Sequence, residues 1–171
     1  RCRRIRCEEY PMFQSFDVKS DPSQGPERVA RLRQWLEKER LDGFLVPRAD
    51  EHQGEYVAAS SERLSWLTGF TGSAGIALVL KDEALLFVDG RYTLQAPAQT
   101  DTPIFRVIEA PPATLAAEIG SFVPKGGKLG YDPWLHTPGE IKDWTEKLKD
   151  KAELDGLMDE AAYQAFVASL G

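Results

Sequence analysis

The chain has 171 residues, of which 42% are hydrophobic and 28% are charged, a composition typical of an ordinary globular domain. No apolar run approaches the roughly 18 residues that a membrane span requires, so the sequence predicts no transmembrane helix. The net charge of −6 becomes −10 once the four arginines of residues 1–7 are set aside, which argues against a nucleic-acid or anionic-membrane partner. We expect a cytoplasmic protein with one well-packed domain.

The basic start of the chain, RCRRIRC, contains both cysteines, Cys2 and Cys7. Because the body has no cysteine, a disulfide scaffold is excluded, and two cysteines without matching histidines cannot complete a closed zinc site. Residues 1–11 are interpreted as a disordered or extraneous leader that precedes Met12. The alternative, a basic targeting arm, is disfavoured by the shortness of the segment and its lack of serine.

The first elements are predicted from hydrophobic spacing. A helix is expected over residues 26–40, where apolar side chains recur every three or four positions and proline lies in the first turn. The apolar run at residues 43–47 predicts a short buried strand. Residues 48–61 are polar without a clear period, and a second, shorter helix is expected at residues 62–68.

The centre of the chain, residues 69–92, contains a glycine-rich loop and two apolar runs. The loop GFTGSAG is followed by predicted strands at residues 76–80 and 84–88. The polar break at residues 81–83 is short enough for a hairpin. We expect these two strands to form the centre of the sheet.

Shorter elements alternate after the hairpin. Residues 91–99 predict a helical turn that Pro97 cuts short, and residues 104–108 predict a strand. Pro112 is expected to open the next helix, and residues 128–131 to form another short strand.

The last part of the chain contains two further helix patterns. Thr137 to Glu140 has the spacing of a capping box and predicts the start of a helix. A final helix is expected after Asp159. We divide the chain into the leader, an α/β domain over residues 12–150 and a C-terminal tail helix over residues 151–171. Alternating strands and helices around a hairpin predict an α/β fold with a mixed sheet flanked by helices.

The glycine loop permits two functional interpretations, which its context disfavours. A phosphate-binding loop follows a strand and opens a helix, whereas here a helix precedes and a strand follows. A nucleophile elbow around Ser73 would need glycine in place of Thr71. We therefore interpret the loop as a tight connection in which small residues allow close packing.

The polar segment DEHQGEY places acidic residues on both sides of His52. It could hold a cation, but His136 is the only other histidine in the sequence. The alternative is a solvated loop, which is also where binding groups often collect.

The tetrapeptide DGRY at residues 89–92 closes the second central strand. Arg91 offers a planar fork of N–H donors suited to a carboxylate ligand. The alternative is a structural turn in which Arg91 forms an internal salt bridge, for which Asp89 is the nearest candidate.

Four motifs occur in order along the chain: DEHQGEY, RLSWLTGFTGSAG, FVDGRYTLQA and GYDPWLHT. In this order and at these intervals they resemble the N-terminal domain of Xaa-Pro aminopeptidases, which belong to the creatinase and prolidase group. The similarity is to the long, three-domain type of aminopeptidase P and covers roughly residues 12–150.

The resemblance implies a parent enzyme that removes an N-terminal residue preceding proline, so that its substrate is a peptide with proline in the second position. It implies two divalent metal ions, often manganese, in a C-terminal domain of pita-bread fold that lies beyond this chain. None of the metal ligands can be assigned here, so we expect no cofactor in this chain and no peptidase activity from it alone.

The resemblance further implies that this domain shapes access to the active site and contributes to subunit contacts, including a homodimer. His52 and Arg91 are the motif residues that could face the catalytic domain, and both are candidates for binding substrate. Two alternatives remain: a stand-alone binding or oligomerisation module that uses the tail helix, and an independent hydrolase that uses Ser73.

Overall fold

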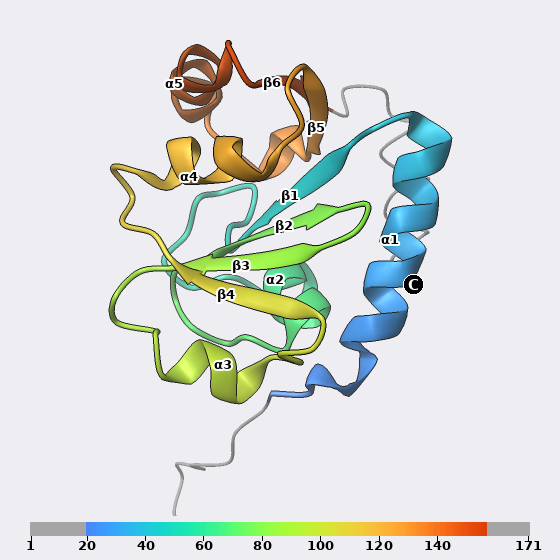
Figure 1. Cartoon of the computed structure of the whole chain (residues 1–171). Coiled ribbons are helices and arrows are strands. Elements are labelled where there is room, and N and C mark those ends of the chain that lie inside the picture. The colour runs from blue at the N-terminus through green and yellow to red at the C-terminus, as the bar shows by residue number, and fades with distance from the viewer. Residues whose placement is uncertain (1–19, 157–171) are drawn as a thin grey trace, which may run out of the picture.

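Six strands in the described part of the chain form one mixed β-sheet in the order β4-β3-β2-β1-β5-β6 (Figure 1). The computed structural model describes residues 20–156. Five of these strands run parallel, and β2, which lies between β1 and β3, runs in the opposite direction. The strands are β1 (Gly43–Pro47), β2 (Ile76–Leu80), β3 (Ala84–Val88), β4 (Phe105–Glu109), β5 (Gly127–Tyr131) and β6 (Ala152–Gly156). The predicted α/β fold with a mixed sheet is confirmed.

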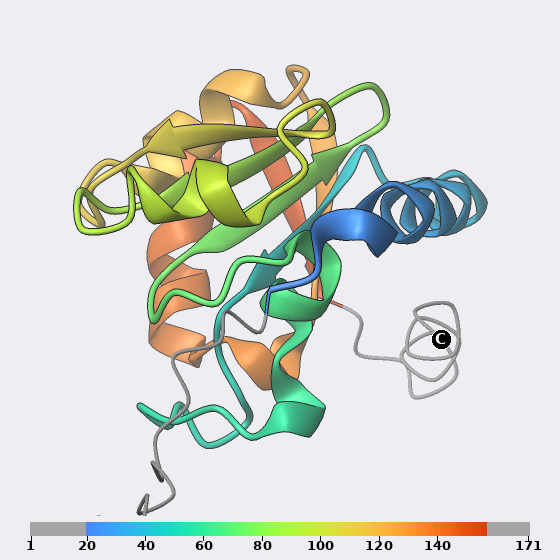
Figure 2. The same cartoon turned by 90° about the horizontal axis from the view of Figure 1, so that it is seen from below.

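Helices cover both faces of the sheet (Figures 1 and 2). One face is covered by α1 (Gly25–Glu39), α2 (Arg63–Thr68) and α3 (Gln95–Gln99). The opposite face is covered by α4 (Leu115–Phe122) and α5 (Pro138–Leu148). The connecting segments contain the short 3-10 helices η1 (Pro22–Gln24), η2 (Ala59–Ser61) and η3 (Pro133–Leu135).

The sheet separates two hydrophobic cores, because successive side chains of a strand point to opposite faces. In β1, Phe44 and Val46 belong to the core shared with α1 and α2, whereas Leu45 belongs to the core shared with α4 and α5. Every residue of β1, β2 and β3 is buried. Burial on both faces explains why these strands read as continuous apolar runs.

The central hairpin has the predicted strand boundaries. Ile76 pairs with Phe87 at its open end, and the Leu80 backbone N–H donates to the Glu83 carbonyl at 2.8 Å beside the turn. The predictions for α1, β1 and α2 are likewise correct to within one residue at each end.

Two predictions about prolines are wrong. Pro97 does not cut a helical turn short but lies inside α3, where the first-turn N–H groups have no partner within the helix and a proline costs little. Pro112 does not open a helix directly, and α4 begins at Leu115. Pro111 precedes Pro112, and a residue before proline avoids the helical conformation, so the helix starts only after this pair.

The strand β6 was not predicted. Ala152–Gly156 pairs in parallel with β5, so these residues of the expected tail helix belong to the sheet. Only Ala152 is buried in this edge strand, and its sequence AELDG therefore lacks the apolar pattern by which strands are recognised. The helix expected after Asp159 and the leader of residues 1–11 lie outside the described residues.

Within residues 20–156, no helix is both long enough and apolar enough to cross a membrane.

Candidate functional site

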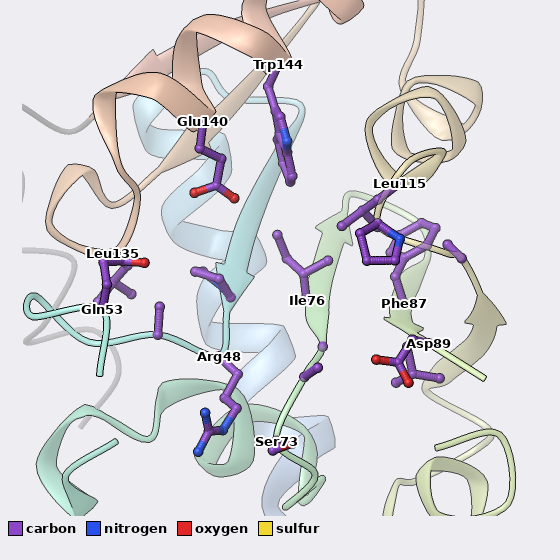
Figure 3. Close-up of a pocket in the computed structure, with 17 residues that line it drawn as sticks. Arg48, Gln53, Ser73, Ile76, Phe87, Asp89, Leu115, Leu135, Glu140 and Trp144 are labelled. Carbon is purple, nitrogen blue, oxygen red and sulfur yellow. The ribbon is translucent and has the colours of Figure 1, made fainter. Parts of the chain in front are cut away.

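A cleft of about 260 Å³ opens at the edge of the sheet where the parallel strands end (Figure 3). Its walls come from the segments that follow β1, β3, β4 and β5, and from the glycine loop that precedes β2. In open α/β sheets, ligands bind in the crevice outside the carboxyl ends of the strands. We call this side of the domain the carboxyl edge.

The glycine loop forms one wall of the cleft through Ser73, Ala74 and Gly75. Its first glycine, Gly69, has φ +83° and ends α2, a conformation in which a side chain would be strained. A Cβ at Gly75 would lie only 3.1 to 3.3 Å from the Phe70 ring, Leu64 and the Phe87 carbonyl. The loop is thus a tight helix-to-strand connection, as predicted.

The polar side chains of the cleft are few, and they come from different segments. They are Arg48, Gln53, Ser73, Asp89 and Glu140. Apolar side chains fill the space between them, including Ile76, Phe87, Leu115, Leu135 and Trp144 (Figure 3).

Asp89 is held by its neighbour Arg91. The guanidinium Nε and Nη2 donate to the two carboxylate oxygens at 3.0 and 2.7 Å, and the Arg91 backbone N–H adds a third bond at 2.9 Å. The side-chain hydrogen bond from Arg91 is the main reason that the pKa of Asp89 lies below its ordinary value. The charge that Asp89 presents to the cleft is therefore already compensated.

Glu140 lies at the start of α5, on the opposite wall. Thr137 caps this helix by accepting the Glu140 backbone N–H at 3.2 Å, as the capping-box pattern predicted. The Glu140 carboxylate does not complete the box; it lies 3.2 Å from Nδ1 of His136. The His136 ring is buried between Tyr131 and Trp144, with centroid distances of 5.5 and 6.0 Å.

A buried ion pair at the carboxyl edge joins the start of α2 to the segment that follows β5. The Asp132 carboxylate, 1% exposed, follows β5 and pairs with Arg63 at the start of α2. The same carboxylate accepts the Trp134 backbone N–H at 2.9 Å, which shapes η3. The ion pair therefore holds the end of the loop after β1 against the start of the loop after β5.

The candidate residue Arg91 lies beside the cleft but does not line it. Its side chain is 67% exposed, pairs with Asp89 and lies over the Tyr92 ring, 5.2 Å from its centre. The internal salt bridge that the sequence suggested as an alternative is thus present. A role for Arg91 in substrate binding stays a prediction.

The candidate residue His52 lies on the exposed loop after β1, with 82% of its side chain accessible. The loop is shaped by Asp50, which accepts the backbone N–H groups of His52 and Gly54 at 3.0 and 2.9 Å. Among the described residues, no hydrogen bond or ion pair joins His52 to Arg91, so the two candidate residues do not interact directly through a polar contact. The role of His52 also stays a prediction.

The alternative chemistries find little support at this edge. Among the described residues, no group of three or more His, Cys, Asp or Glu side chains could hold a metal ion, so this site does not fit a catalytic metal pair. Ser73 forms a hydrogen bond with the Tyr92 hydroxyl, and no histidine is among the described residues that line the cleft.

Sequence reasoning missed Arg48, Gln53 and Glu140 as cleft residues. The capping box placed Glu140 in the first turn of a helix, but nothing in the sequence indicated that this helix faces the end of β1. Three large apolar side chains are also exposed on loops that follow β1, β3 and β5, and they too were not predicted: Tyr56, Leu94 and Trp134.

Comparisons with known proteins give consistent results. Residues 28–161 match the family model described as the creatinase/prolidase N-terminal domain. Xaa-Pro aminopeptidase 2 of Rattus norvegicus is 38% identical over 123 residues, which are 72% of this chain and 18% of the rat protein. The chain thus spans about a fifth of the length of such relatives.

Two solved structures show the same fold. The X-prolyl aminopeptidase of Caenorhabditis elegans, a cytosolic enzyme with a di-nuclear active site, superposes with a TM-score of 0.72 at 27% identity, covering 84% of this chain and 26% of that one. The N-terminal domain of a cytoplasmic peptidase from Mycobacterium tuberculosis superposes with a TM-score of 0.59 at 25% identity, covering 81% of this chain and 97% of that one.

Proposed function

Because the chain belongs to the creatinase/prolidase N-terminal domain family, we propose that it is the non-catalytic N-terminal domain of a metal-dependent Xaa-Pro aminopeptidase. The parent enzyme removes an N-terminal residue that precedes proline, using two divalent metal ions, which we take to be manganese, in a separate catalytic domain. The domain shapes access to that active site and contributes to contacts between subunits of a cytoplasmic enzyme.

The observation that supports this role is the concentration of exposed features at the carboxyl edge. Tyr56, Leu94 and Trp134 are exposed there on three different loops, and His52 and Arg91 lie on two of the same loops. Exposed large apolar side chains with polar neighbours are typical of surfaces that contact another domain or subunit. A catalytic domain that docks against this edge would cover the apolar side chains and meet both candidate residues.

The role of Arg91 is tested in the parent enzyme. Arg91→Ala should raise KM or lower kcat for an Xaa-Pro peptide without changing the melting temperature of the domain, because its exposed ion pair contributes little to stability. His52→Ala should act in the same way. Arg31→Ala removes a similarly exposed arginine from α1 and serves as the control. If both variants change only the melting temperature, the proposed contact with substrate is wrong.

The absence of catalysis is tested on the 171-residue chain itself. With added manganese it should not cleave an Xaa-Pro peptide, because its described residues offer no metal site. Turnover by the purified chain would contradict the proposal.

The exposed apolar side chains also support a second function, a stand-alone module for protein binding or oligomerisation. Sedimentation analysis of the chain with and without residues 157–171 distinguishes the two. A monomer in both forms would argue against self-association through the C-terminal segment.

A further inference from the structure

We propose that the cleft at the carboxyl edge binds a small zwitterion with an apolar body, of the class of free amino acids and dipeptides, between Arg48 and Glu140. This site needs neither a metal ion nor the catalytic domain. It is therefore independent of the proposed function and can be tested on this chain alone.

The charges of the cleft point to a ligand that carries both signs. Three charged side chains line it, and one of them, Asp89, is already compensated by Arg91. Arg48 and Glu140 remain, and among the described residues neither has an ion-pair partner of fixed opposite charge. Buried or partly buried charges are stabilised by a partner of opposite charge. Here the carboxylate of a ligand would pair with Arg48, and its ammonium group would pair with Glu140.

Arg48 retains most of its hydrogen-bonding capacity. Its Nη2 donates to the Glu55 carbonyl at 3.0 Å, which leaves the other guanidinium N–H groups available. Its charge acts at longer range on Asp50, whose pKa is lowered mainly by the hydrogen bond from the Gly54 backbone and only in small part by Arg48. A carboxylate in the cleft could accept two parallel bonds from this guanidinium.

Glu140 offers the complementary acceptor. Oε2 contacts His136, Oε1 has no partner among the described residues, and the side chain is 36% exposed. The capped start of α5 and the buried His136 ring fix the position of the carboxylate before any ligand arrives. Such preorganisation reduces the entropic cost of binding.

The wall between the two charges is apolar. In Figure 3, Glu140 and Arg48 lie on opposite sides of the cleft, with Trp144 beside Glu140 and Ile76 between the two charged residues, while Phe87 lies with Leu115 on the far side of Ile76. The Trp144 ring is well placed to contact an aliphatic body or an ammonium group. A volume of 260 Å³ lies just below the roughly 300–1,000 Å³ typical of small-molecule sites, which favours a ligand of one or two amino acids.

Binding is measured by NMR on the 15N-labelled 171-residue chain, with leucyl-leucine as the probe. The indole N–H signal of Trp144, assigned with Trp144→Phe, should shift and saturate. The signal of Trp35, which belongs to the core on the other face of the sheet, should not move and serves as an internal control. Failure of the Trp144 signal to shift at saturating peptide would overturn the proposal.

Two blocked peptides test the two charges separately. N-acetyl-leucyl-leucine lacks the ammonium group and leucyl-leucine amide lacks the carboxylate, and each should bind about tenfold more weakly than the free dipeptide. If one blocked peptide binds as well as the free dipeptide, the cleft recognises a single charge and the zwitterion proposal is wrong.

Variants that remove one charge at a time connect each effect to its residue. Glu140→Gln should abolish the preference for the free peptide over its acetylated form, and Arg48→Gln should abolish the preference over the amide. Glu146→Gln on the exposed part of α5 and Arg31→Gln on α1 are matched controls that should bind as the unchanged chain does. If the cleft variants and the controls prefer the free dipeptide over its blocked forms to the same extent, the assignment of the two charges to Glu140 and Arg48 is wrong. Even if a variant fails to fold, the blocked peptides still test on the unchanged chain whether the cleft recognises both charges.

Discussion

The buried carboxylate of Asp132 holds together two parts of the chain that lie far apart in sequence. It pairs with Arg63 on α2 and accepts the Trp134 backbone N–H, while only 1% of its side chain is exposed. Breaking a buried pair leaves the remaining charge without compensation, which is why such changes are costly.

We therefore expect Asp132→Asn to lower the free energy of unfolding by about 3 kcal/mol, measured by urea denaturation. Asp143→Asn, which breaks an exposed pair with Lys147 on α5, is the control and should cost less than about 0.5 kcal/mol. Similar losses in the two variants would show that the Arg63–Asp132 pair is not the stabilising contact inferred here.

Asp42 gives the domain a pH-dependent contact. Its two carboxylate oxygens accept the Lys81 ammonium at 2.8 Å and the Lys128 backbone N–H at 2.9 Å. The hydrogen bond from Lys81 is the largest cause of its lowered pKa, followed by that from Lys128. Because the folded pKa lies below the unfolded value, the contact stabilises the fold fully above about pH 4 and is lost as the pH falls through the folded pKa.

The expected result is a difference in unfolding free energy between the unchanged chain and Asp42→Asn that is largest near pH 6. This difference should shrink as the pH falls below about 4, because the Asp42 carboxylate is protonated first in the unfolded state and, below its folded pKa, in the folded state as well. Urea denaturation at a series of pH values measures it, and a difference that stays constant down to pH 2 would contradict the assignment.

At the scale of elements, two glycines have a similar positive φ but differ in the space around them. Comparing their alanine variants therefore separates the cost of the backbone conformation from the cost of a steric clash. Gly69 ends α2 at φ +83°, and a Cβ there would lie 2.5 Å from the Gln99 carbonyl oxygen. Gly126 has a similar φ of +77° but no atom within 4 Å of the same position.

Gly126→Ala should therefore cost only the intrinsic penalty of the left-handed conformation, about 1 kcal/mol. Gly69→Ala should cost more than about 2 kcal/mol, because α3 or η1 must also move. Thermal and urea unfolding of the two variants test this comparison, and equal losses would mean that the contact with Gln99 relaxes freely.

The elements that could be predicted from the sequence are those with a strong local pattern. β1, β2 and β3 are buried on both faces, so their apolar runs stand out, and the cap of α5 depends on Thr137 and its near neighbours alone. β6 was missed because an edge strand with one buried residue needs no apolar pattern, and its pairing with β5 is a tertiary contact.

The candidate site was less predictable than the fold for the same reason. Arg91 and His52 lie in recognisable motifs, and the structure places both on loops of the carboxyl edge. Glu140 and Arg48 line the same cleft only because the start of α5 faces the end of β1, which depends on the order of strands in the sheet. Local sequence carries no information on that order.

At the scale of the whole molecule, the domain combines two helix-covered hydrophobic cores with one edge where the candidate functional features are concentrated. Both faces of the sheet are covered by helices. In residues 20–156, the cleft, the candidate residues and the three large exposed apolar side chains lie where the parallel strands end. A domain built in this way can change its binding properties through loops at that edge without disturbing its cores.

The single reversed strand, β2, has a consequence for how the molecule assembles. It joins β3 through a short turn, whereas β1 must pair with β5, where Gly43 lies opposite Leu129. A hairpin closes in about 1–10 μs, but a parallel pair so distant in sequence forms only after a long loop has closed. We expect the β2–β3 hairpin to form early during folding and β5, with α5 and the Glu140 wall of the cleft, to be added late. In pulse-labelled hydrogen exchange during refolding, amides of β3 should gain protection before those of β5, and the reverse order would contradict this sequence of events.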